Sequence, residues 1–137
     1  TGEHEPPPAP DSPAEQALVA KFVRAYESAD LDAVVALLTD NVFMSMPPMP
    51  LEYEGRDIVA RFCASLLGAG RRFNLVPTRA NGQPAFGAYL RASSGVRYGT
   101  GLFVLTLTPA GDRICAMTRF DSSVLPWFGL PRSLPSR

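Results

Sequence analysis

FNLVPTRANGQPAFGAYL, residues 73–90, has the pattern of a β-hairpin. Apolar and polar residues alternate with a period of two on both sides of a central turn, which favours strands at 73–79 and 85–90. The turn, NGQP, contains Asn-Gly, the strongest short-range hairpin signal, because its glycine readily takes a positive φ. Two further strands, 101–108 and 113–120, are bounded by the turns RASSGVR and PAGD. The C-terminal half is therefore predicted to be a run of antiparallel strands.

Upstream of the hairpin the period changes to that of a helix. Ser12-Pro13 followed by Glu15 is typical of a helix start, with an N-cap, a proline at the first position and an acid three residues after the cap. The predicted helix ends at Ser28 or Ala29. Its apolar stripe consists of Leu18, Phe22, Ala25, Tyr26 and Ala29.

Two more helices and a short strand are predicted before the hairpin. Asp30 caps a second helix, which ends at the turn 39–41. Its buried stripe consists of Leu31, Val34, Val35 and Leu38. Residues 42–46 form a short strand that stops at Pro47-Pro48, since proline cannot donate to a ladder, and an irregular loop leads to Gly55. The third helix, 55–67, ends at Gly68 and Gly70. Its predicted apolar face consists of Ile58, Phe62 and Leu66.

This order of elements predicts the α+β class. Three helices followed by antiparallel strands fit a strongly bent sheet that wraps the helices and leaves a pocket open at one end. The Pro-rich residues 1–13 are predicted to be a linker behind another part of a longer protein, since the chain has no initiator Met. Residues 14–137 are then the folded domain, with an aromatic tail at its C-terminus.

The composition excludes several classes of function. Thirteen Lys and Arg balance thirteen Asp and Glu, so direct nucleic-acid binding by this domain is not expected. No apolar run approaches the roughly 18 residues of a membrane span, and the N-terminus lacks the pattern of a secretory signal. Cys63 and Cys115 fit neither a disulfide framework nor a metal site. We therefore expect a cytoplasmic protein without a metal or cofactor.

Four stretches resemble one known family. They are PTRANGQPAFGAYL (77–90), FDSSVLPWFGLP (120–131), AYESADLDAVVALLTDNV (25–42) and SMPPMPLEYEGRD (45–57). They are similar to the C-terminal, SnoaL-like domain of actinobacterial extracytoplasmic-function sigma-70 factors of RNA polymerase. The resemblance covers about residues 13 to 131. It implies a cone of the nuclear-transport-factor-2-like fold, which also includes polyketide cyclases, ketosteroid isomerases and limonene epoxide hydrolases. The fold alone therefore does not decide the chemistry.

The groups required by enzymes of this fold are largely missing. An isomerase needs an Asp base before a proline on the first strand, and this place holds Met46-Pro47. The tyrosine expected as oxyanion donor on the first helix is replaced by Phe22, with Tyr26 one turn later. The only histidine, His4, lies in the linker. We predict no catalytic residues.

Two carboxylates, Asp121 and Asp57, are candidates for a catalytic role. Asp121 lies near Arg119 at the end of the last strand, where it is either a base or, more simply, half of a rim ion pair. Epoxide hydrolysis needs an Asp-Arg-Asp set, which Asp57, Arg56 and Asp121 supply by type. Asp57 is better explained by its place at the start of a helix, where the dipole favours an acid.

Two functional hypotheses follow. The first is a non-catalytic regulatory domain that contacts the sigma-factor core or RNA polymerase, with Trp127 and Phe128 as a docking patch; the alternative for this tail is that it folds back over the open end of the cone. The second is a SnoaL-like isomerase, cyclase or epoxide hydrolase for a small hydrophobic ring compound. An isologous dimer through the outer face of the sheet is a further alternative that the sequence does not decide.

A cavity ligand is a further expectation. Such a ligand should be small, neutral and apolar, because few groups in the expected cavity can neutralise a charge. The residues predicted to contact it are Phe22, Tyr26, Met46, Tyr53, Phe62, Asn81 and Tyr89, among which Tyr53, Asn81 and Tyr89 would provide the polar contacts. The competing interpretation is that these side chains fill the cone completely.

Overall fold

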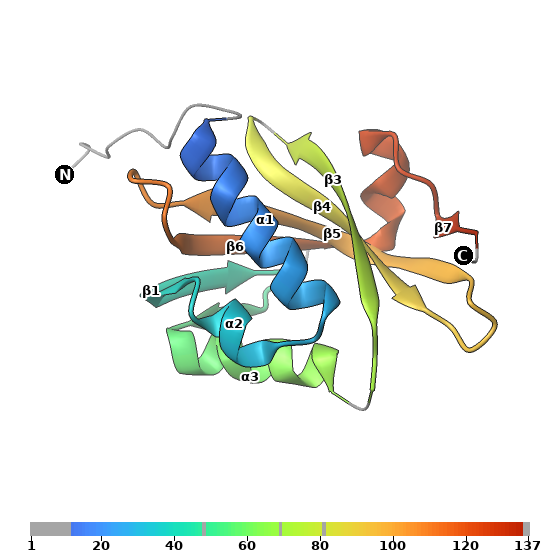
Figure 1. The fold of residues 1–137 in the computed structure, drawn as a ribbon, viewed down its shortest axis with the longest axis horizontal. Coiled ribbons are helices and arrows are strands. Elements are labelled where there is room, and N and C mark those ends of the chain that lie inside the picture. The colour runs from blue at the N-terminus through green and yellow to red at the C-terminus, as the bar shows by residue number, and fades with distance from the viewer. Residues whose placement is uncertain (1–11, 48, 69, 81, 136–137) are drawn as a thin grey trace.

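A computed structural model describes residues 12–47, 49–68, 70–80 and 82–135 of the chain. Three helices and two strands, of eight and three residues, precede the main run of strands (Figure 1). In chain order the elements are α1 Pro13–Glu27, α2 Leu31–Val35, β1 Leu38–Ser45, β2 Glu52–Glu54, α3 Arg56–Leu67, β3 Phe73–Ala80, β4 Gln83–Arg91, β5 Arg97–Leu107, β6 Ile114–Asp121, the 3-10 helix η1 Ser122–Phe128, and β7 Ser133–Leu134. Most of the predicted linker, residues 1–13, lies outside the described residues.

The described strands form one mostly antiparallel sheet. Its order is β2-β1-β6-β5-β4-β3, and β7 pairs with β5. The pairing of β1 with β6 is parallel, and the other described pairings are antiparallel. The sheet has free edges at β2 and β3 and does not close into a barrel. The predicted α+β class is therefore confirmed.

Apolar side chains form two cores on opposite faces of this sheet. Successive residues of a strand point to opposite faces. On β4, Phe86 and Ala88 belong to the larger core, which also contains buried residues of α1, α2 and α3. Ala85 and Tyr89 belong to a smaller core with residues of the C-terminal segment, 122–134. Figure 1 shows η1, in red, set apart from the three α-helices. The helices and the C-terminal segment thus cover different faces.

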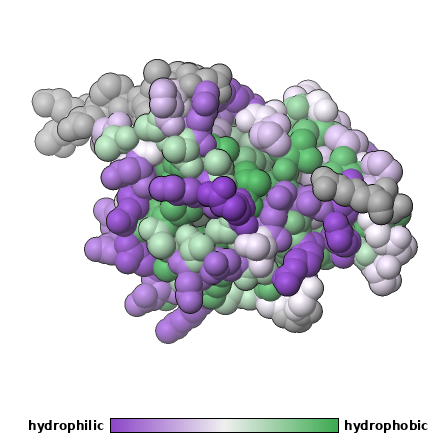
Figure 2. Space-filling view, in the orientation of Figure 1, coloured by the Kyte–Doolittle hydropathy of each residue, from purple (hydrophilic) through white to green (hydrophobic). Residues whose placement is uncertain are grey.

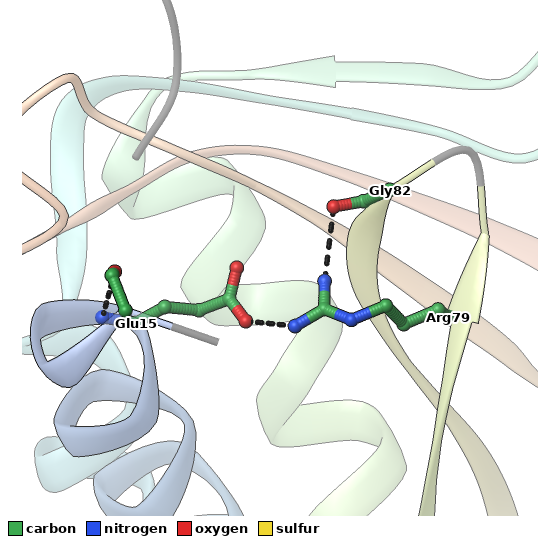
Figure 3. A network of polar contacts seen from close by, with 4 residues as sticks. Glu15, Arg79 and Gly82 are labelled. Atoms are coloured by element: carbon green, nitrogen blue, oxygen red, sulfur yellow. Dashed lines mark hydrogen bonds and ion pairs between the residues drawn. The ribbon is translucent and has the colours of Figure 1, made fainter. Parts of the chain in front are cut away.

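A buried carboxylate ties the start of α1 to the β3–β4 hairpin (Figure 3). Ser12 Oγ accepts a hydrogen bond from the Glu15 backbone N–H at 3.2 Å, which confirms the predicted N-cap. The buried Glu15 carboxylate pairs with the Arg79 guanidinium, which also donates to the Gly82 carbonyl at 2.9 Å. A charge removed from water needs such a partner, so this pair holds α1 against the hairpin.

The predicted boundary between the second helix and the first strand was wrong. Residues 38–41, expected to end the helix and form a turn, belong to β1. Leu38 lies beside Ile114 of the parallel strand β6, and its carbonyl accepts a hydrogen bond from Arg56 at 2.9 Å. Pairing across the sheet replaces the local turn. The predicted loop before Gly55 also contains β2, which pairs antiparallel to β1.

The buried face of α3 differs by one position from the predicted face. Its buried side chains are Val59, Cys63 and Leu67. Ile58 is 40% exposed, whereas Phe62 and Leu66 pack at the edge of the larger core. The two stripes are neighbours, about 100° apart on the helix, so the choice depends on where the sheet lies. Cys63 lies on this buried face, whereas Cys115 of β6 is only half-buried.

Candidate functional site

A cavity of about 240 Å³ opens between α1, the end of α3 and the helix-facing side of the sheet. It is lined by Tyr26, Leu66, Arg71, Phe73, Leu90, Thr100, Phe103 and Arg119. Its walls are mainly apolar, and two guanidinium groups lie among them. This combination separates it from the polar hollow of about 500 Å³ at the start of α3, which Asp40, Arg56 and Asp57 help to line.

Tyr26 provides a buried hydroxyl at this cavity. Its ring makes edge contacts with Phe73 and Phe103, at centroid distances of 5.6 and 5.7 Å. The hydroxyl has no hydrogen-bond partner within the described part of the chain. Burial raises the pKa of Tyr26 well above its ordinary value, Cys63 adds to the rise, and Arg119 opposes it. The phenol is therefore a neutral hydrogen-bond donor at physiological pH.

Arg119 points to the helix side of β6 and makes no direct ion pair among the described residues, although its charge helps to lower the pKa of Asp121. Its guanidinium carbon lies 6.0 Å from the centre of the Phe103 ring, and Nη2 donates to the Thr100 carbonyl at 2.9 Å. Arginine carries five N–H donors in a planar fork, so most of its donors are not used by these contacts. Arg119 thus brings a cation and spare donors to the wall of the cavity.

Asp121 takes a different role from the predicted rim ion pair with Arg119. Its carboxylate caps η1 and accepts hydrogen bonds from the Ser123 hydroxyl and from the Ser123 backbone N–H, the latter at 2.9 Å. The Ser123 hydroxyl first, and then its backbone N–H, lower the pKa of Asp121. An exposed carboxylate stabilised as an anion is a weak base, so this geometry favours a capping role over a catalytic one.

The Asp-Arg-Asp set considered for epoxide hydrolysis is not assembled. Arg56 pairs with Asp40 at 3.0 Å and bonds to Leu38, which lies beside the first residue of β6. Asp121 is the last residue of β6, and a strand rises about 3.3 Å per residue, so the two groups are separated by roughly 20 Å. Asp57 lies in the first turn of α3, where the dipole favours an acid, and this helix has no side-chain capping hydrogen bond.

The structure brings only part of the predicted ligand set to the cavity. Tyr26 lines it. Phe22 is fully buried in the larger core, stacked on Phe86 at 5.5 Å, and Met46 is buried as well. Tyr53 and Phe62 pack against each other at 5.5 Å and are not among the residues that line this cavity. Asn81 lies outside the described residues.

Tyr89, which is predicted to contact the ligand, does not line the cavity. It belongs to the smaller core on the other face of the sheet, where its hydroxyl donates to the Pro131 carbonyl at 2.6 Å. The reason is parity, because Tyr89 is an odd number of residues from the helix-facing Phe86 and Ala88. Sequence reasoning missed Arg71, Thr100 and Arg119, although Arg119 shares the parity of the buried Met117.

The C-terminal segment forms the second feature of functional interest. It lies on the sheet face opposite the helices and not over the open end of the cone. Leu125 and Leu130 are buried there, so this segment is part of the smaller core. Phe128 is partly buried against the same core, whereas Trp127 is 85% exposed. The segment therefore presents one large aromatic side chain to solvent on a packed support.

Other classes of site find little support in the described residues. No helix among them is long and apolar enough to cross a membrane. They contain no group of three or more His, Cys, Asp or Glu side chains that could hold a metal ion. Figure 2 shows hydrophilic and hydrophobic residues interspersed over the face that carries α1, with no single continuous apolar face. The cavity and the C-terminal segment remain the two candidates.

Comparison with solved structures defines the class of fold. An NTF2-like protein from Mesorhizobium loti aligns with a TM-score of 0.63 and 19% identity, over 83% of this chain and 95% of that one. The epoxide hydrolase/cyclase-like enzyme SalBIII, which takes part in pyran ring formation in the polyether salinomycin, aligns with a TM-score of 0.63 and 23% identity. The alignment covers 81% of this chain and 92% of that one. A SnoaL-like protein from Burkholderia thailandensis gives 0.59 and 19%, over 82% and 97%. These similarities establish a nuclear-transport-factor-2-like fold.

Sequence comparison places the chain within this class. A family model described as "SnoaL-like domain" matches residues 19–121, and the chain belongs to that family. The "ECF RNA polymerase sigma factor SigG" of Mycobacterium tuberculosis, from strains CDC 1551 / Oshkosh and ATCC 25618 / H37Rv, is 37% identical over 131 residues. The match covers 92% of this chain and 34% of each relative, so the chain spans about a third of their length. The resemblance to SnoaL-containing sigma factors is thereby confirmed.

Proposed function

We propose that this chain is a non-catalytic regulatory domain of an extracytoplasmic-function sigma factor. The observation that carries the proposal is the 37% identity to sigma factors over 92% of the chain, since the enzyme-like structural neighbour is only 23% identical and supports the fold alone. The domain would modulate transcription initiation by contacting the sigma core or RNA polymerase, without touching DNA itself. This role places the protein in the cytoplasm.

The C-terminal segment supplies the proposed contact surface. An interface of this kind depends on a few large anchors, and tryptophan is among the residues most often found in that role. Trp127 is exposed, while the neighbouring Leu125 is held in the smaller core. The anchor is therefore positioned before binding, which lowers the entropy cost of association. Because this segment also covers part of the outer sheet face, it narrows the surface available for an isologous dimer.

The alternative, a SnoaL-like enzyme, has no specific observation in its favour. Proton abstraction at the cavity needs a base within hydrogen-bond reach of the substrate. Among the described residues that line the cavity, the charged groups are Arg71 and Arg119, and burial keeps Tyr26 protonated. None of these groups is suited to accept a proton at neutral pH.

The test compares Trp127→Ala with Met49→Ala in the full-length sigma factor. Met49 is an exposed apolar residue that does not belong to the C-terminal segment, and it serves as a matched control. Binding of each factor to purified RNA polymerase is measured by fluorescence anisotropy. Loss of a central anchor costs about 2 kcal/mol or more, or roughly thirtyfold in affinity. Equal affinities for Trp127→Ala, Met49→Ala and the unmodified factor would refute docking through this segment.

A further inference from the structure

The cavity beside Tyr26 carries two positive charges, and no carboxylate lines it among the described residues. Arg119 contributes from β6, and Arg71 contributes from the loop that follows α3. Arg71 donates to the Ser65 carbonyl at 2.6 Å and Arg119 to the Thr100 carbonyl at 2.9 Å, and neither is ion-paired within the described residues. Two guanidinium groups in a mainly apolar wall attract an anion, because their forked donors match the two oxygens of a carboxylate.

A third donor, the Tyr26 hydroxyl, belongs to a residue of the cavity wall. The Tyr26 hydroxyl is fully buried and has no partner in the part of the chain that the structure describes, although nearly all buried polar groups in proteins do have one. Arg119 influences the ionisation of Tyr26, so the hydroxyl and the guanidinium share one environment. An oxygen acceptor bound at Arg119 would give this hydroxyl the partner that the protein does not supply.

The rest of the wall defines the body of the ligand. Leu66, Phe73, Leu90 and Phe103 are apolar. The volume of about 240 Å³ lies below the roughly 300–1,000 Å³ typical of pockets for drug-sized ligands, so the guest must be small. We infer that this cavity binds a small monocarboxylate with an apolar body, its carboxylate held by Arg119, Arg71 and the Tyr26 hydroxyl.

This site differs from the one expected from sequence. The sequence predicts a neutral ligand because the expected lining contains neither Arg71 nor Arg119, whereas both line the cavity in the structure. The binding is a property of the chain itself and does not depend on the proposed role in transcription, so either can fail while the other stands.

Isothermal titration of the 137-residue chain tests the inference with matched probes. The carboxylates are benzoate, phenylacetate and octanoate, and each is compared with its neutral amide. Inorganic phosphate separates recognition of any anion from recognition of an amphipathic one. We expect at least one carboxylate to bind at least tenfold more tightly than its amide and more tightly than phosphate. Equal binding of acid and amide, tighter binding of phosphate, or no carboxylate binding at millimolar concentration would overturn the inference.

Two variants place the carboxylate within the cavity. Arg119→Gln is expected to weaken carboxylate binding by about ten- to hundredfold while leaving amide binding unchanged, because it removes a charged donor. Arg113→Gln, at an exposed arginine in the turn before β6, is the matched control. Tyr26→Phe removes the unpartnered hydroxyl alone, so the protein should remain folded and still bind several-fold more weakly. Unchanged affinity in both Arg119→Gln and Tyr26→Phe would overturn the assignment.

Discussion

Replacement of Leu125 by Ala tests whether the C-terminal segment is part of the folded domain. The Leu125 side chain is fully buried. A Cβ atom on Gly99 would lie 2.4 Å from one of its methyl groups and a Cβ on Gly87 3.4 Å from the other, so the glycines leave the space that this leucine fills. Leu→Ala in a protein core costs about 2–5 kcal/mol. Because the smaller core lies near the surface and can partly collapse, we expect about 2–3 kcal/mol.

Thermal unfolding followed by circular dichroism measures this loss. For a domain of this size, a decrease of about 2–3 kcal/mol corresponds to a melting temperature lower by roughly 6–12 °C. Trp127→Ala is the control, since its side chain is exposed and the change should stay within about 0.5 kcal/mol. Gly99→Ala should be destabilising by about 1–3 kcal/mol, because its new methyl group overlaps Leu125. If Leu125→Ala melts at the same temperature as Trp127→Ala, the segment is not packed on the sheet.

Three further predictions concern buried and titrating groups. Glu15→Gln should lower the free energy of unfolding in urea by about 1–3 kcal/mol, because it removes the charged partner of Arg79; an unchanged midpoint would contradict the pair. Burial raises the pKa of the Cys63 thiol to about 11, so a thiol reagent at pH 8 should label the half-buried Cys115 first, and equal rates would contradict the burial of Cys63 in α3. Folding lowers the pKa of Asp121, so its contribution to stability is present above the unfolded pKa of about 3.9 and is lost as the pH falls through the folded pKa. In a plot of the free energy of unfolding against pH, Asp121→Asn should therefore show a smaller loss of stability at acid pH. An equal loss in both proteins would argue against the η1 cap.

Elements with local signals could be predicted from the sequence. The start of α1 depends on Ser12 and Pro13, which act within one helical turn. The structure confirms the predicted start, with Ser12 as the N-cap and Pro13 as the first residue of the helix. The β3–β4 hairpin depends on Asn-Gly and on alternation along two adjacent strands. In each case the information lies within a few residues of the element, so no knowledge of the rest of the fold is needed.

Elements fixed by distant partners could not be predicted. Leu38 has the spacing of a helical stripe with Val34, yet it pairs with Ile114, which lies far along the chain. The three residues of β2 are strand only because β1 lies beside them. Pairing across the sheet overrides local propensity in both places.

The candidate site was only partly predictable for a related reason. Tyr26 belongs to the buried stripe of α1 that helical spacing predicts, and it lines the cavity. Arg119 was missed because its value as a cavity cation depends on Phe103 and Thr100, its neighbours on β5. The burial of Leu125 likewise depends on glycines in other strands, which leave space that composition cannot reveal.

This domain is proposed to regulate a sigma factor. In vitro transcription with purified RNA polymerase tests this role. The full-length factor and the same factor lacking this domain are titrated separately on one cognate promoter, and their transcript yields are compared. Removal of the domain is expected to change the transcript yield at equal factor concentration, because a contact with the sigma core or polymerase is lost. Identical yields across the whole titration, with both proteins folded, would contradict it.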